Sequence, residues 1–222
     1  MEQARFMDEN YVKKVTLEDL MLVQQIKKPE AYQRLLRHLF ASPGQEYDRG
    51  KIAIYLGVTK VTLEEAMKLI QQTDLLIFVD RFSQNAEPLK RLNLKIYPID
   101  YGLTLAMTKI IPDIEADMQK GMIAESLVAQ TLKRLKYIDY IAYMQQTRLK
   151  QRKEIDFYLR SNLKDCPIKV KYRNQVKTNE FDFMRQIINE RNLEGGLIIN
   201  IEDWDIDEKL YYVPLWAFML LA

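Results

Sequence analysis

The sequence predicts an α+β protein with two parts: a helical arm and winged helix-turn-helix over residues 1–105, and a mixed-sheet α/β domain over residues 106–222. Two short helical patterns separated by Gly57 precede two apolar strand patterns, which is the element order of a winged helix. After residue 106, helical and strand periodicities alternate along the chain. With 222 residues, of which 48% are hydrophobic, the chain has enough apolar side chains for two cores.

The first part begins with two expected helices, over residues 11–28 and 30–41. A short helix is expected over residues 48–56, ended by Gly57, and a turn at residues 58–60 follows it. We expect Thr62 to cap the next helix, with Glu65 completing a capping box. Strand patterns at 75–79 and 92–98, joined by a polar loop at 83–88, complete the predicted wing.

DNA binding by this winged helix is one of two interpretations. The outward face of its second helix mixes acidic and basic residues and is nearly neutral, whereas DNA-reading faces are usually basic. The wing has more positive charge, from Arg81, Lys90, Arg91 and Lys95. The alternative is a spacer or protein-docking winged helix.

The second part is expected to contain a long helix over residues 113–136 and strands near 138–144, 154–160 and 166–173. A second amphipathic helix is expected at 178–192, followed by strands at 197–201 and 210–215.

The apolar stretch at 211–222 has about half of the ~20 residues that a membrane helix needs, and residues 1–5 do not resemble a secretion signal. We therefore expect a cytoplasmic protein without membrane association.

Composition removes several classes of chemistry. The chain has a single cysteine, Cys166, which excludes a disulfide framework and a Cys-rich zinc site and suits a reducing compartment. Its single histidine, His38, leaves no His-His pair for a metal and is expected to be a half-buried structural residue.

Positive charge is concentrated in residues 146–177. This stretch has ten Lys or Arg residues and three Asp or Glu residues, a net charge of +7, whereas the whole chain carries +2 and the remainder therefore −5. A basic sheet surface indicates a polyanion or an acidic partner surface, and a merely solvated face is the alternative.

Alternation along two expected strands predicts a cluster of charged residues. One face of residues 167–173 carries Lys169, Lys171 and Arg173. In the preceding strand, Ile155 and Phe157 share one face, and the opposite face carries Glu154, Asp156 and Tyr158. Asp156 is therefore expected beside Lys169 and Lys171, with Glu125 of the long helix nearby. Carboxylates and a lysine in this arrangement are the parts of a Mg²⁺-dependent phosphodiesterase.

These residues resemble the PD-(D/E)XK nuclease superfamily: Gly121 four residues before Glu125, the run Glu-Ile-Asp-Phe at 154–157, and Pro-Ile-Lys-Val-Lys at 167–171. Nearly the whole chain is similar to the C-terminal half of a family of prokaryotic AAA+ ATPases, in which a winged helix and a restriction-endonuclease-like domain follow the ATPase module. Further similarities to that family lie at residues 11–15, 97–103, 195–199 and 213–216. The resemblance implies Glu125, Asp156 and Lys171 as the catalytic positions.

The chain departs from this family in two ways. An acid is usual where this sequence has Lys169, and replacing an oxygen ligand by an ammonium group penalises Mg²⁺ binding by at least about a few kcal/mol. Ion pairs are therefore expected rather than a metal site, unless Glu154 or Glu180 supplies the lost ligand.

The sequence also contains no phosphate-binding Gly-x-x-x-x-Gly-Lys-Ser/Thr motif, so ATP hydrolysis is not expected. We expect either a fragment of a longer protein or a stand-alone remnant.

The sequence thus predicts a non-catalytic nucleic-acid-binding or regulatory module that holds no cofactor and acts beside an ATPase domain or another protein. DNA is the expected partner, and its phosphates would contact Arg152, Lys153, Lys169, Lys171 and Arg173. Two alternatives remain open: a Mg²⁺-dependent nuclease with a relocated carboxylate, and a protein-docking module.

Overall fold

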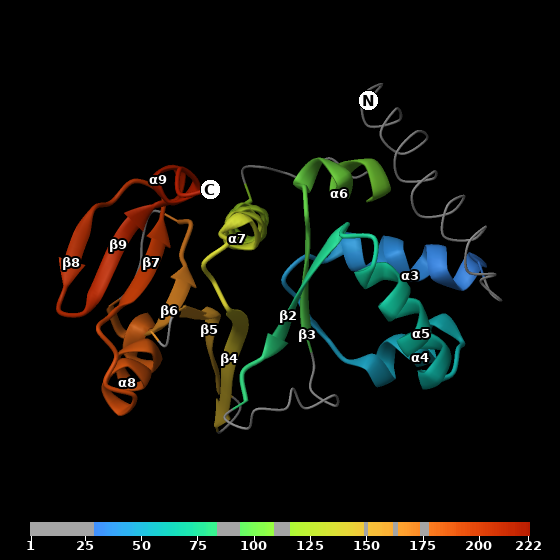
Figure 1. Cartoon of the computed structure of the whole chain (residues 1–222), viewed down its shortest axis with the longest axis horizontal. Helices are drawn as coiled ribbons and strands as arrows, with labels where there is room; N and C mark the ends of the chain where they lie inside the picture. Colours follow the sequence, from blue (N-terminus) through green and yellow to red (C-terminus); the bar gives the residue numbers. More distant parts are fainter. Residues whose placement is uncertain (1–28, 84–93, 109–115, 149–150, 162–163, 174–177) are drawn as a thin grey trace. The chain divides into compact units, whose positions relative to one another are not determined.

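The computed structural model describes residues 29–83, 94–108, 116–148, 151–161, 164–173 and 178–222. They contain seven α-helices and nine strands in parallel and antiparallel pairs, so the protein is a mixed α/β structure (Figure 1). The described residues form two compact units, one of residues 29–78 and 94–108 and one of residues 79–83 and 116–222. Within these ranges, no helix combines the length and apolar character that crossing a bilayer requires. The expected helix at 11–28 lies outside the described residues.

The first unit is built from four helices and short strands. Its helices are α3 (Pro29–Ala41), α4 (Arg49–Leu56), α5 (Lys60–Gln71) and α6 (Tyr101–Thr108). Its strands are β1 (Glu46–Tyr47), β3 (Leu94–Pro98) and the first half of β2 (Leu76–Arg81), which continues into the second unit. β1 pairs antiparallel with β3. The buried core joins α3 to α4, α5 and α6 and includes Leu36, Phe40, Leu63 and Ile96.

The turn between α4 and α5 follows from two residues. Gly57 has a φ of 64°, a left-handed conformation that ends α4 at little steric cost. Thr59 is the cap of α5, because its side-chain oxygen accepts a hydrogen bond from the N–H of Thr62. The expectation that Thr62 would be the cap is therefore wrong: Thr59 already has an extended backbone, and the helix begins at Lys60.

Two of the basic residues expected on the wing, Arg81 and Lys95, are held by contacts or burial within the fold. Lys95 lies within β3, all of whose residues are buried, and only 2% of its surface is exposed. Its expected role as an exposed cation is therefore wrong. Arg81 donates a hydrogen bond to the main-chain oxygen of Gln145, at 2.8 Å. Lys90 and Arg91 lie outside the described residues.

The second unit is a mixed sheet with helices on both faces (Figure 1). Its remaining strands are β4 (Tyr140–Arg148), β5 (Gln151–Ser161), β6 (Lys164–Val170), β7 (Gly196–Asn200), β8 (Asp205–Asp207) and β9 (Leu210–Pro214). The strand order is β2-β4-β5-β6-β7-β9-β8. α7 (Asp117–Arg134) carries Glu125, α8 (Asp182–Glu190) follows a short 3₁₀ helix η3 (Thr178–Phe181), and α9 (Leu215–Met219) is the last helix.

A β-bulge in β5 changes which residues share a face. Ala142 of β4 pairs with Tyr158 and Met144 pairs with Ile155, so two residues of β5 face one residue of β4. Ile155 and Tyr158 consequently lie in one buried cluster with Phe183 and Ile187 of α8. The expectation that Tyr158 would share the face of Asp156 is therefore wrong, because the extra residue interrupts the alternation.

The C-terminal elements are only partly those that the sequence predicts. β7 and β9 match the expected strands at 197–201 and 210–215. The short strand β8, which pairs antiparallel with β9, was not expected, and neither was helix α9, which starts directly after Pro214. Leu215 and Phe218 anchor α9 because their side chains are buried.

Candidate functional site: a carboxylate cluster on the sheet

The site is positioned by the antiparallel pair β5 and β6. Phe157 of β5 lies opposite Ile168 of β6, which brings the preceding Asp156 beside the following Lys169. The Asp156 side chain is 4% exposed and that of Lys169 is 15% exposed. The sequence-based expectation that Asp156 lies beside Lys169 is confirmed.

Both carboxylate oxygens of Asp156 accept a hydrogen bond. Oδ1 accepts from the ammonium group of Lys169 at 2.6 Å, and Oδ2 accepts from the main-chain N–H of Val170 at 2.7 Å. A charge-assisted pair of this length in a buried position is strong. The ion pair therefore fixes Asp156 and Lys169 in a single arrangement.

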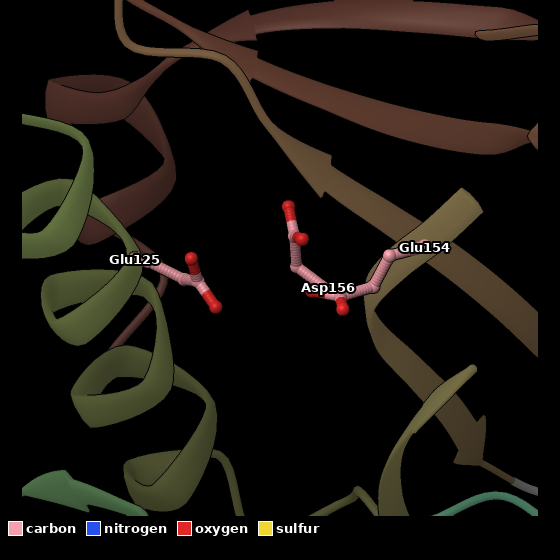
Figure 2. A group of neighbouring side chains, drawn as sticks. All are labelled: Glu125, Glu154 and Asp156. Atoms are coloured by element: carbon pink, nitrogen blue, oxygen red, sulfur yellow. The ribbon is translucent and has the colours of Figure 1, made fainter. Parts of the chain in front are cut away.

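Two further carboxylates lie close to Asp156. One ligand oxygen from each of Glu125, Glu154 and Asp156 lies within 4.8 Å of the other two. Glu125 projects from α7 toward the sheet, and Glu154 and Asp156 come from β5 (Figure 2). Glu154 also accepts hydrogen bonds from Nε and Nη2 of Arg152, at 3.0 and 2.6 Å. We call Glu125, Glu154 and Asp156 the carboxylate cluster.

The carboxylate cluster has oxygen donors suited to Mg²⁺ but does not fit the ion as it is arranged. Magnesium needs nearly octahedral oxygen coordination at about 2.0–2.1 Å. The ammonium group of Lys169 already occupies Oδ1 of Asp156, and the Arg152 guanidinium binds Glu154. Two cations of the chain itself therefore already pair with two of the three carboxylates.

Lys171, the third position implied by the resemblance, pairs with an acid outside the carboxylate cluster. Lys171 forms an ion pair with Glu180 at 2.9 Å, and Arg173 also bonds to Glu180. Glu180, one of the two acids considered as a relocated ligand, thus holds two cations and is not part of the carboxylate cluster. Glu154, the other acid, does belong to the cluster.

Most of the described cations in the basic stretch form ion pairs with acids. Among the side chains described in residues 146–177, ion pairs hold Arg152, Arg160, Lys164, Lys169, Lys171 and Arg173. Lys153 is exposed on β5. Two of the acids, Glu180 and Glu194, lie beyond the basic stretch in the sequence. Net charge along the chain could not show these pairs, because they form only when the sheet assembles.

A second acid on these strands is also held in its charged form. Arg160 donates to Asp165 at 2.9 Å, and the Tyr158 hydroxyl donates to it at 2.5 Å. Burial raises the pKa of Asp165, but the hydrogen bonds from Arg160 and Tyr158 outweigh it, and the pKa is lowered overall. Burial and the bond to Asp165 raise the pKa of Tyr158. The bonds from Arg160 and Tyr158 to Asp165 therefore join β5 to β6 at the end of the strand pair away from Lys169.

Comparison with known proteins gives two family matches. A family model described as a domain of unknown function, DUF8612, matches residues 1–113. A second model, also a domain of unknown function, DUF4143, matches residues 120–218. No curated protein matches the chain. Since the first model covers just over half of the 222 residues, the chain belongs to the DUF8612 family.

Proposed function

We propose that this protein is a non-catalytic nucleic-acid-binding or regulatory module, composed of a winged helix and a degenerate nuclease-like domain. The ion pair between Lys169 and Asp156 carries the proposal. It supplies positive charge to the carboxylate cluster from within the chain, so the cluster is stable without a metal. A nuclease of the resembled type needs that position for a metal that activates water.

The winged-helix part of the proposal is supported by local geometry in the first unit. The left-handed Gly57 and the Thr59 cap give a sharp turn between α4 and α5. β2 and β3 follow α5, and the Ile99 N–H donates to the Leu75 oxygen at 3.0 Å. A helix pair followed by two strands in this order is typical of winged helices.

Nucleic-acid contact would be made by cations that retain solvent exposure. Lys153 is exposed, and the side chains of Arg152 and Arg173 are 46% and 42% exposed. Such residues bind phosphate without reading base sequence. Lys169 contributes less than the sequence predicts, because its ammonium group is committed to Asp156.

The regulatory part of the proposal rests on the second family match. The DUF4143 match at residues 120–218 is to a domain type known in AAA-ATPase-associated proteins. This agrees with the resemblance to the C-terminal half of AAA+ proteins. In this proposal the module acts beside an ATPase module.

The test is fluorescence anisotropy with a labelled duplex oligonucleotide at several salt concentrations. Arg152→Ala with Lys153→Ala should weaken binding by about tenfold or more at low salt. Lys133→Ala with Arg134→Ala removes the same charge from exposed positions on α7 and is the matched control, expected to change affinity by less. If both double variants lose affinity equally, binding reflects net charge alone and the assignment to β5 is wrong.

Two further outcomes would overturn the proposal. Nicking of supercoiled plasmid that requires Mg²⁺ or Mn²⁺ and disappears in Asp156→Ala would identify an active nuclease. Absence of any binding at low salt would favour a protein-docking module instead.

A further inference from the structure

An exposed apolar surface lies at the outer margin of the second unit. It consists of Trp204, Ile206, Tyr211 and Trp216, which we call the aromatic margin. Trp204 is 64% exposed and Ile206 is 67% exposed. β8, which carries Ile206, is the outermost strand of this sheet (Figure 1). Four large apolar side chains exposed in one region indicate an interaction site rather than scattered surface residues.

The pairing of β8 with β9 places Ile206 and Tyr211 on one face. Ile206 lies directly opposite Tyr211. The neighbouring pair, Asp207 and Leu210, faces α8: Asp207 bonds to Arg185, and Leu210 packs in the cluster of Phe181 and Ile187. Ile206 and Tyr211 therefore point away from α8, since side chains alternate along a strand.

The two tryptophans join this face to α9. Their rings pack edge to face, with centroids 6.3 Å apart and planes at 77°. Trp204 lies just before β8 and Trp216 lies in α9. The stacking keeps both indoles in place while more than half of each remains exposed. The surface is thus pre-formed, which lowers the entropy cost of binding.

Negative charge surrounds the aromatic margin. Residues 201–209 contain five carboxylates and one lysine, a net charge of −4. Arg185 neutralises Asp207, and the other acids of this segment, Glu202, Asp203, Asp205 and Glu208, are exposed. An aromatic surface surrounded by carboxylates attracts cations in two ways, by charge complementarity and by the negative faces of the indoles.

The strand edge itself is poorly suited to pairing with another strand. β8 has only three residues, and the N–H of Ile206 donates to Asp205 Oδ1 at 2.8 Å. Short, charged edges with satisfied N–H groups disfavour strand addition. A partner would therefore bind the side-chain face rather than extend the sheet. A second copy of the chain is also disfavoured, because the acidic segments around the two aromatic margins would repel each other.

We propose that the aromatic margin binds a lysine- or arginine-rich segment of a partner protein that also carries apolar side chains. The apolar side chains of that segment would cover Ile206 and Tyr211, and its cations would lie over the indoles and near the surrounding carboxylates. This surface is distinct from the carboxylate cluster and does not depend on nucleic-acid binding.

The chain offers a direct reporter for this proposal, because Trp204 and Trp216 are its only two tryptophans. The probe is a short fluorescein-labelled peptide in which leucines alternate with pairs of lysines. Binding should change tryptophan emission saturably, raise the peptide's anisotropy and weaken several-fold as salt rises. A peptide with glutamates in place of the lysines, and one with glycines in place of the leucines, should bind at least about tenfold more weakly.

Ile206→Ser should reduce affinity for the lysine–leucine peptide by about tenfold or more. The control is Ile54→Ser, which removes an 82% exposed isoleucine from α4 and should leave peptide affinity unchanged. Equal binding of the glutamate peptide, or unchanged affinity in Ile206→Ser with an unchanged melting temperature, would overturn the proposal. So would a dimer of the protein that Ile206→Ser converts to a monomer, since the margin would then be covered by a second copy.

Discussion

Lys169 supplies the nearest positive charge to the most buried acid of the carboxylate cluster. Its ammonium group contacts Asp156 at 2.6 Å, and both side chains are largely buried. Breaking a buried pair by removing one partner leaves the other charge uncompensated. We therefore predict that Lys169→Met lowers the free energy of unfolding by about 3 kcal/mol in a urea titration. Lys164→Met breaks the exposed pair with Glu194 and should cost less than about 1 kcal/mol.

The reverse prediction concerns Lys169→Glu. This variant removes the internal cation and adds a fourth carboxylate near Glu125, Glu154 and Asp156. Like charges at these distances destabilise the fold unless a cation binds. We predict that Mn²⁺ raises the melting temperature of Lys169→Glu and that calorimetry detects its uptake, whereas the unmodified protein shows neither effect. Equal Mn²⁺ uptake by both proteins would contradict the role given to Lys169.

Cys166 should be unreactive in the folded protein. Burial raises the pKa of its thiol from 9.0 to about 11, although a main-chain hydrogen bond with Leu197 acts in the opposite direction. At pH 8 the thiolate fraction should therefore be about 100-fold lower than in the unfolded chain. Labelling with a thiol reagent should be slower in buffer than in urea by a similar factor. Equal rates would show that the thiol is solvated.

The raised pKa of Cys166 also predicts how the stability of the fold changes with pH. The thiol pKa is higher in the folded than in the unfolded state, so the stability linked to Cys166 is fully present below pH 9 and is lost as the pH rises toward about 11. Cys166→Ala should flatten the decrease in melting temperature over this alkaline range. An unchanged alkaline profile would assign the decrease to other groups.

At the residue scale, alternation was enough to predict that Asp156 lies beside Lys169. It was not enough to predict which charges remain available. Glu180 comes from η3 and binds Lys171 and Arg173, and Glu194 binds Lys164 from a position 30 residues away. Such contacts depend on how helices and strands pack in three dimensions, which no local pattern encodes.

The close approach of β9 to the start of β7 makes one glycine necessary. A Cβ atom at Gly195 would lie 2.6 Å from the main-chain oxygen of Lys209 and 2.5 Å from Cε2 of Tyr211. Because the first atom belongs to the backbone, the strands must move apart to accept it. We predict that Gly195→Ala lowers the free energy of unfolding by about 1–3 kcal/mol, measured by urea denaturation.

Gly121 provides the contrasting substitution. It lies within α7, and apart from the adjoining residues and backbone of that helix no atom would lie within 4 Å of an added Cβ. Alanine is favoured over glycine inside a helix by about 1 kcal/mol. Gly121→Ala should therefore raise the free energy of unfolding by up to that amount. A lower free energy of unfolding in Gly121→Ala would mean that the added methyl group clashes with a neighbouring part of the protein.

At the element scale, hydrophobic periodicity predicted the described long helices and most strands, because amphipathic patterns are strong over such lengths. It failed where one residue decides the geometry. The extra residue in β5 reverses the face of Tyr158, and Thr59 rather than Thr62 caps α5. β8 has three residues and two of them are acids, so it lacks the pattern by which strands are recognised.

For the whole molecule, local ion pairs limit how strongly a polyanion can bind. Residues 146–177 have ten cations, but six of those described are paired with acids. Each phosphate contact contributes about −0.9 to the slope of log affinity against log salt. With contacts limited to the exposed Arg152, Lys153 and Arg173, we predict a slope of about −3 for duplex DNA, whereas contacts from all ten cations would give about −9. A slope near the larger value would mean that DNA displaces the carboxylates from their cations.

The path of the chain between the two units limits how the protein can be divided. Residues 79–83 belong to the second unit, yet residues 94–108 of the first unit follow them. Asp80 and Arg81 pair with Ala142 and Tyr143 of β4. A truncated gene product that starts at residue 116 would lack this strand and would leave β4 with an open edge, which is a template for aggregation. Insoluble expression of such a fragment would reflect the missing strand rather than an inability of the second unit to fold.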